Sequence, residues 1–464
     1  MPIDKLHDDA LLEIFDFCTI VHEISMSKET LEAWQTLVHV CRKWRTVVFG
    51  SPRRLNLRLY CLTKTRTPLR DTLDIWPALP LRIRGTAYET EELDNIIAVL
   101  ERSDRVYHID ISTRHLGDVS AAMQKPFPEL THVYMDLSPS DAVTIVPDSF
   151  LGGAAPRLQV VSLKGISFPG LPRLLLSASR LINLHLHDIP HSGYFSPKSI
   201  VTALSTLVSL RTLRLGFQSP QYFPDEESRR PPPLTRSVLR VLKKLTFKGV
   251  SEYLEDLVAR IDTPQLSFLD ITLFNQIVFD TPQFIQFISR APTLKALEEA
   301  SLTFTNFAVE IVLSSSNGSG YVFVDVKVLC RDSDWQVSSL EQVCTSCLPP
   351  LFALEDLYIY ESGKSPPEWR DNIENSLWLA LLYPFSAVKN LYLSEEFAPR
   401  IAPALQELAG GGTTEVLPTL QNIFLEGLQP SGPAQEGIRK FVAARQLSSH
   451  NITVSRWQGP DFPL

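Results

Sequence analysis

The chain has 464 residues, 44% of them hydrophobic, and a formal net charge of -8 at pH 7. It is long enough for several ordinary domains or one long repeat array, and its acidic balance argues against a general affinity for nucleic acid. No apolar run approaches the roughly 20 residues of a membrane span, and no basic-then-apolar leader is found, so we expect a protein of the cytoplasm, the nucleus or both. Six cysteines are too few for a disulfide framework and are expected to be reduced thiols.

The first 60 residues, called the head, carry more apolar residues than so short a segment can bury by itself. An apolar face over residues 9–17 predicts a helix that begins near Asp8 and Asp9. A second apolar pattern over residues 31–48 repeats at three- and four-residue steps, and Gly50 and Pro52 mark its end. Because roughly 50 residues make a marginal domain alone, we expect the head to bind a partner surface.

The head resembles an F-box, in the form found in filamentous-fungal F-box proteins. The motif positions are Leu6, Leu11, Leu12, Ile14, Val40, Cys41, Trp44, Arg45 and Pro52, within a stretch that includes WQTLVHVCRKWRTVVFGSPRRLNLRLYC. Two departures are His7, where proline is usual, and a longer segment from Thr19 to Ala33. The resemblance implies that the head binds a Skp-family adaptor and, through it, a cullin. The expected contact residues are Leu6, Leu11, Leu12, Ile14, Phe15, Val40, Cys41 and Trp44. The alternative is a generic helical pair that packs on the rest of the chain.

Residues 61–75 are polar, contain breakers and show no helical or strand period, so they are expected to be a linker. From Trp76 onward, strand-like runs alternate with helical stretches. The runs share the template L-x-x-L-x-L, which starts at residues 106, 130, 158, 181, 210, 242, 266, 354, 388 and 420. The intervals bracket the leucine-rich-repeat period of roughly 20 to 29 residues. The predicted fold is therefore α/β: a helical F-box over 1–60, a linker, and a curved leucine-rich-repeat-like solenoid over 76–464.

The usual asparagine of the repeat is absent, and turns such as LKGI at 163–166 and LHDI at 186–189 place an aliphatic residue after Gly or Asp instead. We expect that residue to fill the same inner volume. Helices are expected at 91–103, 199–207, 250–261, 281–292 and 374–385, several after Ser or Thr caps. Exposed connections are expected at 224–233, at 314–320 before a strand, and at 409–415. A helix near 437–446 and a strand near 451–457 would cap the array.

Strand alternation predicts which side chains face the concave side of the array: the third and fifth residues of each template and the one that follows. In the middle units these are Lys164, His185, His187, Arg214, Lys244 and Lys248. In the last units they are Asp356, Tyr358, Tyr360, Asn390, Tyr392, Asn422, Phe424 and Glu426. We expect the aromatic residues to anchor an apolar or aromatic substrate segment, and the basic middle to attract an acidic or phosphorylated one. The alternative is that Tyr and Phe merely suit strands.

Motifs for catalysis and metal binding are incomplete in this sequence. Gly363-Lys364-Ser365 lacks the upstream glycine and the helix start of a phosphate-binding loop. Cys344 and Cys347, even with Cys330, lack a fourth zinc ligand, and His185 and His187 lack a clustered carboxylate. The chain is therefore not expected to be an enzyme, and neither a metal nor a cofactor is expected.

The function expected from the resemblance is that of a substrate-recognition subunit in a cullin-RING ubiquitin ligase of the SCF type. The F-box would bind the Skp-family adaptor, and the solenoid would bind a protein substrate. The alternative is an adaptor-bound F-box scaffold that acts outside ubiquitination. No nucleic-acid or membrane partner is expected.

Overall fold

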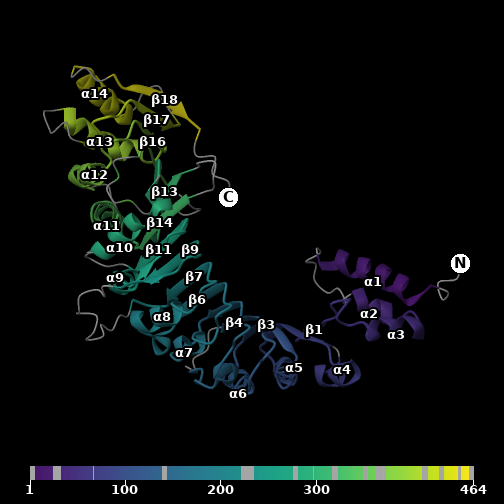
Figure 1. Cartoon of the computed structure of the whole chain (residues 1–464). Helices are drawn as coiled ribbons and strands as arrows, with labels where there is room; N and C mark the ends of the chain where they lie inside the picture. The colour runs from purple at the N-terminus through teal and green to yellow at the C-terminus, as the bar shows by residue number, and fades with distance from the viewer. Residues whose placement is uncertain are drawn as a thin grey trace. The chain divides into compact units, whose positions relative to one another are not determined.

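A computed structural model gives the fold (Figure 1). It describes residues 6–23, 33–65, 67–137, 144–220, 235–274, 279, 281–295, 297–315, 322–348, 351, 354–361, 369, 373–409, 416–427, 433–447 and 451–458. The chain forms two compact units, Met1–Phe195 and Ser196–Leu464. The expected connections at 224–233 and 410–415, most of the one at 314–320, and Gly363-Lys364-Ser365 lie outside the described residues.

Three helices form the head: α1 Asp8–Glu23, α2 Ala33–Val38 and α3 Arg42–Gly50. Cys41 caps α3, because its Sγ accepts a hydrogen bond from the Trp44 N–H. Leu11 and Phe15 of α1 are fully buried, and Trp34 of α2 is 1% exposed. The Trp34 Nε1–H donates to the Arg58 carbonyl at 2.9 Å. The indole therefore links the head to the segment that leads into the first strand.

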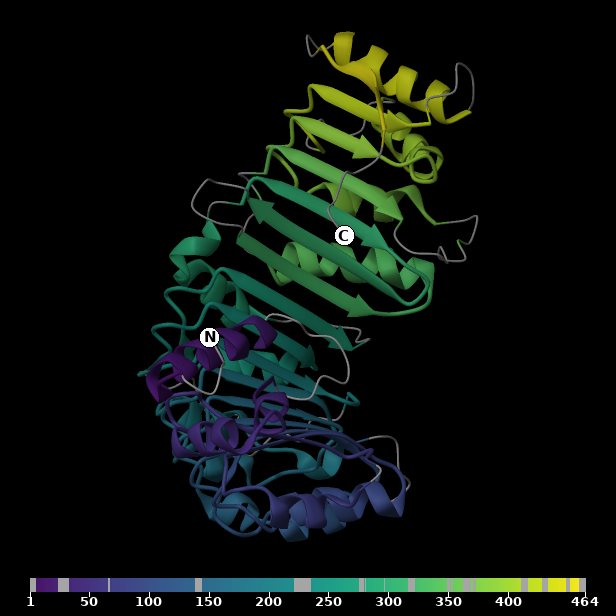
Figure 2. The ribbon, with the colours of Figure 1, turned by 90° about the vertical axis from the view of Figure 1, so that its right-hand side faces the viewer.

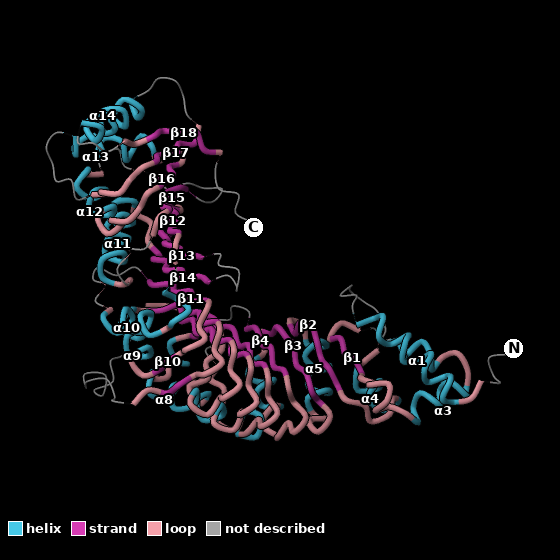
Figure 3. Tube along the Cα trace, turned by 45° about the horizontal axis from the view of Figure 1, so that its top comes forward, coloured by secondary structure: helices cyan, strands magenta, loops and turns pink. Residues whose placement is uncertain are grey.

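The first unit also contains a parallel sheet. Its strands, in spatial order, are β1 Leu59–Leu62, β2 Leu81–Ala87, β3 Val106–Thr113, β4 His132–Leu137, β5 Val160–Lys164 and β6 Asn183–Ile189. The connections hold α4 Leu69–Ile75, α5 Thr90–Leu100, α6 Leu116–Ala122 and α7 Leu171–Leu175, with 3-10 turns η2 Phe150–Gly153 and η3 His191–Gly193. Helices α4–α7 lie along one side of these strands (Figures 1 and 3). The opposite strand face is the one that carries the predicted polar side chains.

The segment predicted as a linker, 61–75, is instead part of the folded unit. The last residues of strand β1 lie in this segment, and helix α4 forms its C-terminal part. Leu69 and Leu73 of α4 are buried. The buried Asn95 amide holds both pieces, accepting from the Leu69 N–H at 2.8 Å and donating to the Thr63 carbonyl at 2.9 Å. A four-residue strand and a two-turn helix are too short to show a period. This contact through Asn95 is long-range and has no local signal.

The second unit has a longer strand row. Its spatial order is β7 Thr212–Phe217, β9 Lys244–Gly249, β11 Phe268–Phe274, β14 Val322–Leu329, β13 Ala308–Ser315, β12 Glu299–Phe304, β15 Asp356–Glu361, β16 Asn390–Leu393, β17 Asn422–Glu426 and β18 Thr453–Trp457. Its helices are α8 Pro197–Leu204, α9 Ser251–Val258, α10 Pro282–Arg290, α11 Ser333–Ser346, α12 Asn375–Leu382, α13 Ala398–Ala409 and α14 Pro433–Leu447, with η5 Pro292–Lys295 and a small pair, β8 Ser237–Val238 with β10 Ile261–Asp262. In Figure 2 the strand row lies in front of these helices.

Every L-x-x-L-x-L run predicted to form a strand does so, and the expected terminal helix and strand are α14 and β18. The aliphatic positions are buried, as Leu357, Leu391 and Ile423 illustrate, because they face the helix layer. Two of the predicted turns match expectation: Gly165 and Asp188 adopt positive φ, and Ile166 and Ile189 after them are buried at 6% exposure each. The equivalent turn FKGV at 247–250 does not, because Gly249 has no positive φ and Val250 is only partly buried. The parallel α/β architecture is therefore confirmed.

An insertion between β11 and β15 breaks the repeat. Strand β13 runs antiparallel to both β12 and β14, while β14 is parallel to β11 and β12 is parallel to β15. The expected strand after residues 314–320 is β14, and β13 pairs antiparallel with it. Strands β12 and β13 were not predicted, because they lack the template.

Candidate functional site

Three aromatic rings stack on the strand face that lies away from the helices of the second unit. Tyr358 in β15, Tyr392 in β16 and Phe424 in β17 occupy equivalent register positions. Ring centroids lie 4.2 Å apart for Tyr358 and Tyr392, and 4.5 Å apart for Tyr392 and Phe424, with interplanar angles of 13° and 9°. The predicted aromatic positions therefore come together as one ladder. All three rings are only partly buried.

Trp457 in β18 completes this group, which is called the aromatic patch: Tyr358, Tyr392, Phe424 and Trp457. The Trp457 ring centroid lies 5.6 Å from that of Tyr392 and 6.0 Å from that of Tyr358, at steep angles. Sequence reasoning missed it, because β18 follows no template. Its alternation would have identified it, since Trp457 is the register partner of Glu426, one of the predicted positions.

A row of polar side chains runs beside the aromatic patch, and is called the polar ladder: Asp356, Asn390, Asn422 and Thr453. The Asn390 amide donates to the Asp356 carboxylate at 2.7 Å, and the Asn422 amide donates to the Asn390 carbonyl oxygen at 2.8 Å. The Thr453 hydroxyl donates to Asn422. These bonds run across neighbouring strands and hold the side chains in one orientation each. The predicted positions Asp356, Asn390 and Asn422 thus support the aromatic patch.

Carboxylates make the border of the aromatic patch negative. Burial raises the pKa of Tyr358, and the adjoining Tyr392 and the carboxylates of Asp356 and Glu299 add to the rise. Burial and then Asp356 likewise raise the pKa of Tyr392. Glu299 itself has a raised pKa because of burial and the nearby Asp356. A partner that brings positive charge to this border would be favoured.

The strands before the aromatic patch are not uniformly basic, contrary to expectation. Lys244 Nζ lies 5.3 Å from the centre of the Phe268 ring, and Lys248 Nζ lies 5.9 Å from that of Phe274. The next strands present acidic side chains on the same face: Asp270, Asp325 and Glu310, with Lys327 bonded to Glu310 at 3.1 Å. Burial and then Glu310 raise the pKa of Asp325 to about 9. These acids were missed because two of the three strands belong to the insertion.

The other predicted basic positions divide between the units. Lys164 and the two histidines lie in the first unit, where Lys164 pairs with Asp136 at 3.1 Å. The His185 and His187 rings lie 6.1 Å apart. Arg214, on β7 of the second unit, is exposed. Tyr360 and Glu426 are partly buried on β15 and β17. Tyr360 lies on the same strand as Tyr358 and extends the face toward the end of that strand.

The predicted adaptor-binding residues of the head are not all on its surface. Leu11, Leu12 and Phe15 are buried, at 0%, 6% and 0% exposure, so they form the core of the head rather than an exposed contact surface. Trp44 is half-buried, with its ring edge-on against Phe15 at 4.8 Å. Leu6 and Cys41 are also partly buried. The helical period in the sequence identifies the apolar residues. Which of them stay exposed depends on how the third helix packs against the other two.

Three large apolar residues in the described part of the head are exposed instead. Ile14 and Val40, both predicted contacts, are 43% and 54% exposed, and Phe17 is 72% exposed. Ile14 and Phe17 lie three residues apart on α1 and therefore on the same side of the helix. Phe17 was not predicted, because the motif pattern ends before it.

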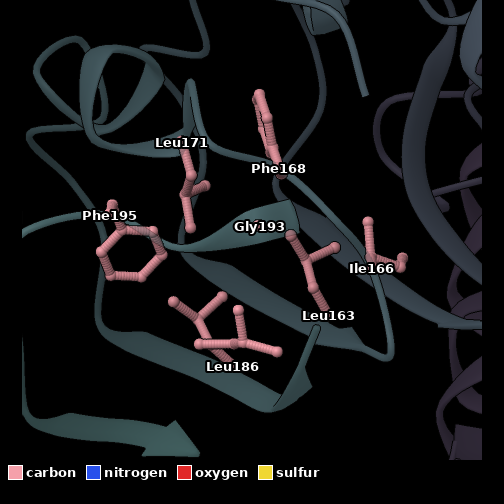
Figure 4. Close-up of a pocket in the computed structure, with 8 residues that line it drawn as sticks. Leu163, Ile166, Phe168, Leu171, Leu186, Gly193 and Phe195 are labelled. Carbon is pink, nitrogen blue, oxygen red and sulfur yellow. The ribbon is translucent and has the colours of Figure 1, made fainter. Parts of the chain in front are cut away.

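Chemical sites are scarce in the described part of the chain. No group of three His, Cys, Asp or Glu side chains there could hold a metal ion. Cys330, Cys344 and Cys347 are buried and form no disulfide, and burial raises the pKa of each of the first two thiols. The described residues enclose a gap of about 10 Å³. It lies among Leu163, Phe168, Leu186 and other apolar side chains (Figure 4). It is too small and too apolar for a ligand.

None of the described helices is both long and apolar enough to span a membrane.

No protein-family model and no curated protein matches the chain. Among solved structures, it is similar to the leucine-rich repeat-containing protein LegL7 from Legionella pneumophila. The two share 11% sequence identity and align with a TM-score of 0.29, over 83% of this chain and 97% of that one.

Proposed function

We propose that this protein is the substrate-recognition subunit of a cullin-RING ubiquitin ligase. The head would bind a Skp-family adaptor, and the aromatic patch would bind a protein substrate. The chain itself would catalyse no reaction. The resemblance of the head to an F-box supplies the first half of the proposal, and the aromatic patch supplies the second.

The aromatic patch is the observation that carries substrate binding. Four large rings on neighbouring strands are left only partly buried, on the face away from the helices. Interface anchors are enriched in Tyr and Trp, and the polar ladder beside them offers amide and carboxylate groups for the backbone of a partner. Acidic residues border the patch, so the partner segment is expected to combine an apolar or aromatic anchor with basic residues.

The exposed apolar residues of the head support adaptor binding. Ile14, Phe17 and Val40 would supply the apolar contact, while the buried Leu11 and Phe15 hold α1 against the other helices. This assignment separates contact residues from core residues, so the two sets can be substituted separately.

Affinity purification with mass spectrometry tests the proposal in two arms. Ile14→Asp with Val40→Asp should lose the adaptor and cullin but keep other partners. Tyr392→Ala with Phe424→Ala should lose a set of those partners but keep the adaptor and cullin. Adaptor without cullin in the wild-type sample would favour a scaffold acting outside ubiquitination. No adaptor in any sample would reject the ligase role.

A further inference from the structure

Two arginines and two histidines gather on the first unit, on the strand face away from α4–α7. They are called the cationic cluster: Arg58, Arg82, His108 and His132. Arg82 of β2 is in register with His108 of β3, which is in register with His132 of β4. Side chains in register on neighbouring strands stand side by side, and the two imidazole rings stack with centroids 5.1 Å apart.

Aromatic rings, rather than carboxylates, hold the two guanidinium groups. The register shift between β2 and β3 leaves Tyr107 as an extra residue, and its ring lies 4.8 Å from the Arg58 guanidinium. The Arg82 guanidinium lies 5.3 Å from the centre of the Tyr60 ring. Within the described residues, neither arginine forms an ion pair with a carboxylate. Their charge therefore stays uncompensated.

The nearest acids on this face are already paired. Asp110 accepts from Arg84 at 3.2 Å, and Asp136 accepts from Lys164 at 3.1 Å. These four residues, with Tyr134, Ser162 and His187, line a hollow of about 370 Å³ directly beside the cationic cluster. The hollow has room for a group attached to an anion bound at the cluster.

The hydrogen-bonding capacity of the cluster is incompletely used. Arg82 Nε and His108 Nε2 are buried and have no hydrogen-bond partner among the described residues. The Thr131 hydroxyl lies 2.9 Å from the Tyr107 carbonyl oxygen and 2.8 Å from His132 Nδ1. When the hydroxyl donates to the carbonyl, its oxygen accepts from His132 Nδ1–H. His132 Nε2 is then the nitrogen that would gain a proton. Buried polar groups without partners usually mark a missing water or ion.

The electrostatics of the two histidines would favour a bound anion. Burial, and then Arg82, His132, Arg84 and Arg58, lower the pKa of His108 to about 3. Burial and then Arg82 and Arg58 also lower the pKa of His132. Tyr60, Tyr107, Asp110 and Tyr134 are the other titratable groups facing the pair from β1, β3 and β4. An anion would offset the repulsion from the arginines and let both imidazoles take up protons.

We propose that the cationic cluster binds a phosphate-class oxyanion, held by the two guanidinium groups and by the imidazoles once they are protonated. A doubly charged tetrahedral anion suits this donor set, because guanidinium and imidazolium groups form charge-assisted hydrogen bonds to its oxygens. The site lies in the first unit and does not depend on the aromatic patch. Its failure would leave the proposed function untouched.

Calorimetric titration of the full chain with inorganic phosphate, at constant ionic strength, tests the site. Saturable binding is expected at pH 6, with at least a tenfold loss in Arg82→Gln. Arg58→Gln gives a second measure if Arg82→Gln fails to fold. The matched control is Arg102→Gln, because Arg102 pairs with Asp74 at 2.8 Å outside the cluster and should leave binding unchanged.

Sulfate, which stays doubly charged, isolates the histidines in a second titration. Its affinity should rise from pH 8 to pH 5.5, by up to about tenfold per pH unit for each proton taken up. His108→Asn with His132→Asn should flatten this dependence. Tighter binding of N-acetyl-O-phosphoserine amide than of inorganic phosphate would assign the anion to a protein partner, and the reverse would assign a free ion. No saturable binding by wild type, or equal binding by Arg82→Gln and Arg102→Gln, would overturn the proposal.

Discussion

Removal of Tyr392 tests the aromatic patch most sharply, because this ring is the middle one of the ladder. It stacks on Tyr358 at 4.2 Å and on Phe424 at 4.5 Å. Each stacked pair contributes about 0.5 to 1.5 kcal/mol. Tyr392→Ala should therefore lower the free energy of unfolding by about 1 to 3 kcal/mol through the two lost stacked pairs, and the lost edge-on contact with Trp457 adds to this. Phe424→Ala, which loses one stacked pair, should lower it by no more than about half as much.

Guanidinium-induced unfolding of the full chain measures both values. Tyr392→Phe is the matched control, because it keeps both stacked pairs and removes only the hydroxyl. It should remain much closer to wild type than Tyr392→Ala. If Tyr392→Ala is no more destabilising than Phe424→Ala, the rings do not stack as a ladder, and the patch is not the ordered surface described.

Three further predictions concern the head, the pH dependence and the polar ladder. Phe15→Ala should destabilise the head by about 3 to 5 kcal/mol, whereas the exposed Ile14→Asp should change the stability by no more than about 0.5 kcal/mol, as thermal unfolding of both variants would show. Because the pKa of Asp325 is raised to about 9 in the folded state, its contribution to stability is present at pH 4 and is lost as the pH rises through 9. Asp325→Asn should lose less stability than wild type between pH 5 and pH 9, and equal losses in melting temperature would contradict this. Asn390→Ala removes two bonds of the polar ladder, at 2.7 and 2.8 Å, and should lower the free energy of unfolding by about 2 kcal/mol in denaturant titration, more than the exposed Thr453→Val.

The strands of the repeat could be predicted because each carries its own signal. In every repeat, the template places aliphatic side chains such as Leu357 and Leu391 toward the helices. Strand alternation then determines which side chains lie on the opposite face. Strands β1, β2, β12 and β13 could not be found in this way. Strand β1 is four residues long, and β12 and β13 pair antiparallel within an insertion that has no repeat.

The candidate site was predictable to the same extent. Alternation placed Tyr358, Tyr392 and Phe424 on one face, and the register brings them into contact. The positions of the acidic residues beside them depend on the order of the strands in the insertion. No local sequence pattern predicts that order. In the head, the helical period identified Leu11 and Phe15 as apolar but could not show that Trp34 of α2 packs against Phe49 and Trp76.

Charge was the least predictable property of the faces. Lys164 looks available in the sequence, yet Asp136 on the neighbouring strand pairs with it. Arg82 belongs to a strand that was not predicted, and it lies beside His108 only because of the register of β2 and β3. Net charge at a site is set by pairs across strands, so it follows from topology rather than from composition.

Site-specific photo-crosslinking tests the central claim most directly. A photoreactive phenylalanine analogue would replace Tyr360, which extends the face of the aromatic patch, or Tyr383, which is 55% exposed at the end of α12. Both sites were tyrosines, so the substitutions are matched. In cells, crosslinks to protein partners are predicted from position 360, and they should disappear when Tyr392→Ala and Phe424→Ala are added. Crosslinks only from position 383, or crosslinks from 360 that survive those substitutions, would contradict the assignment of the patch as the binding surface.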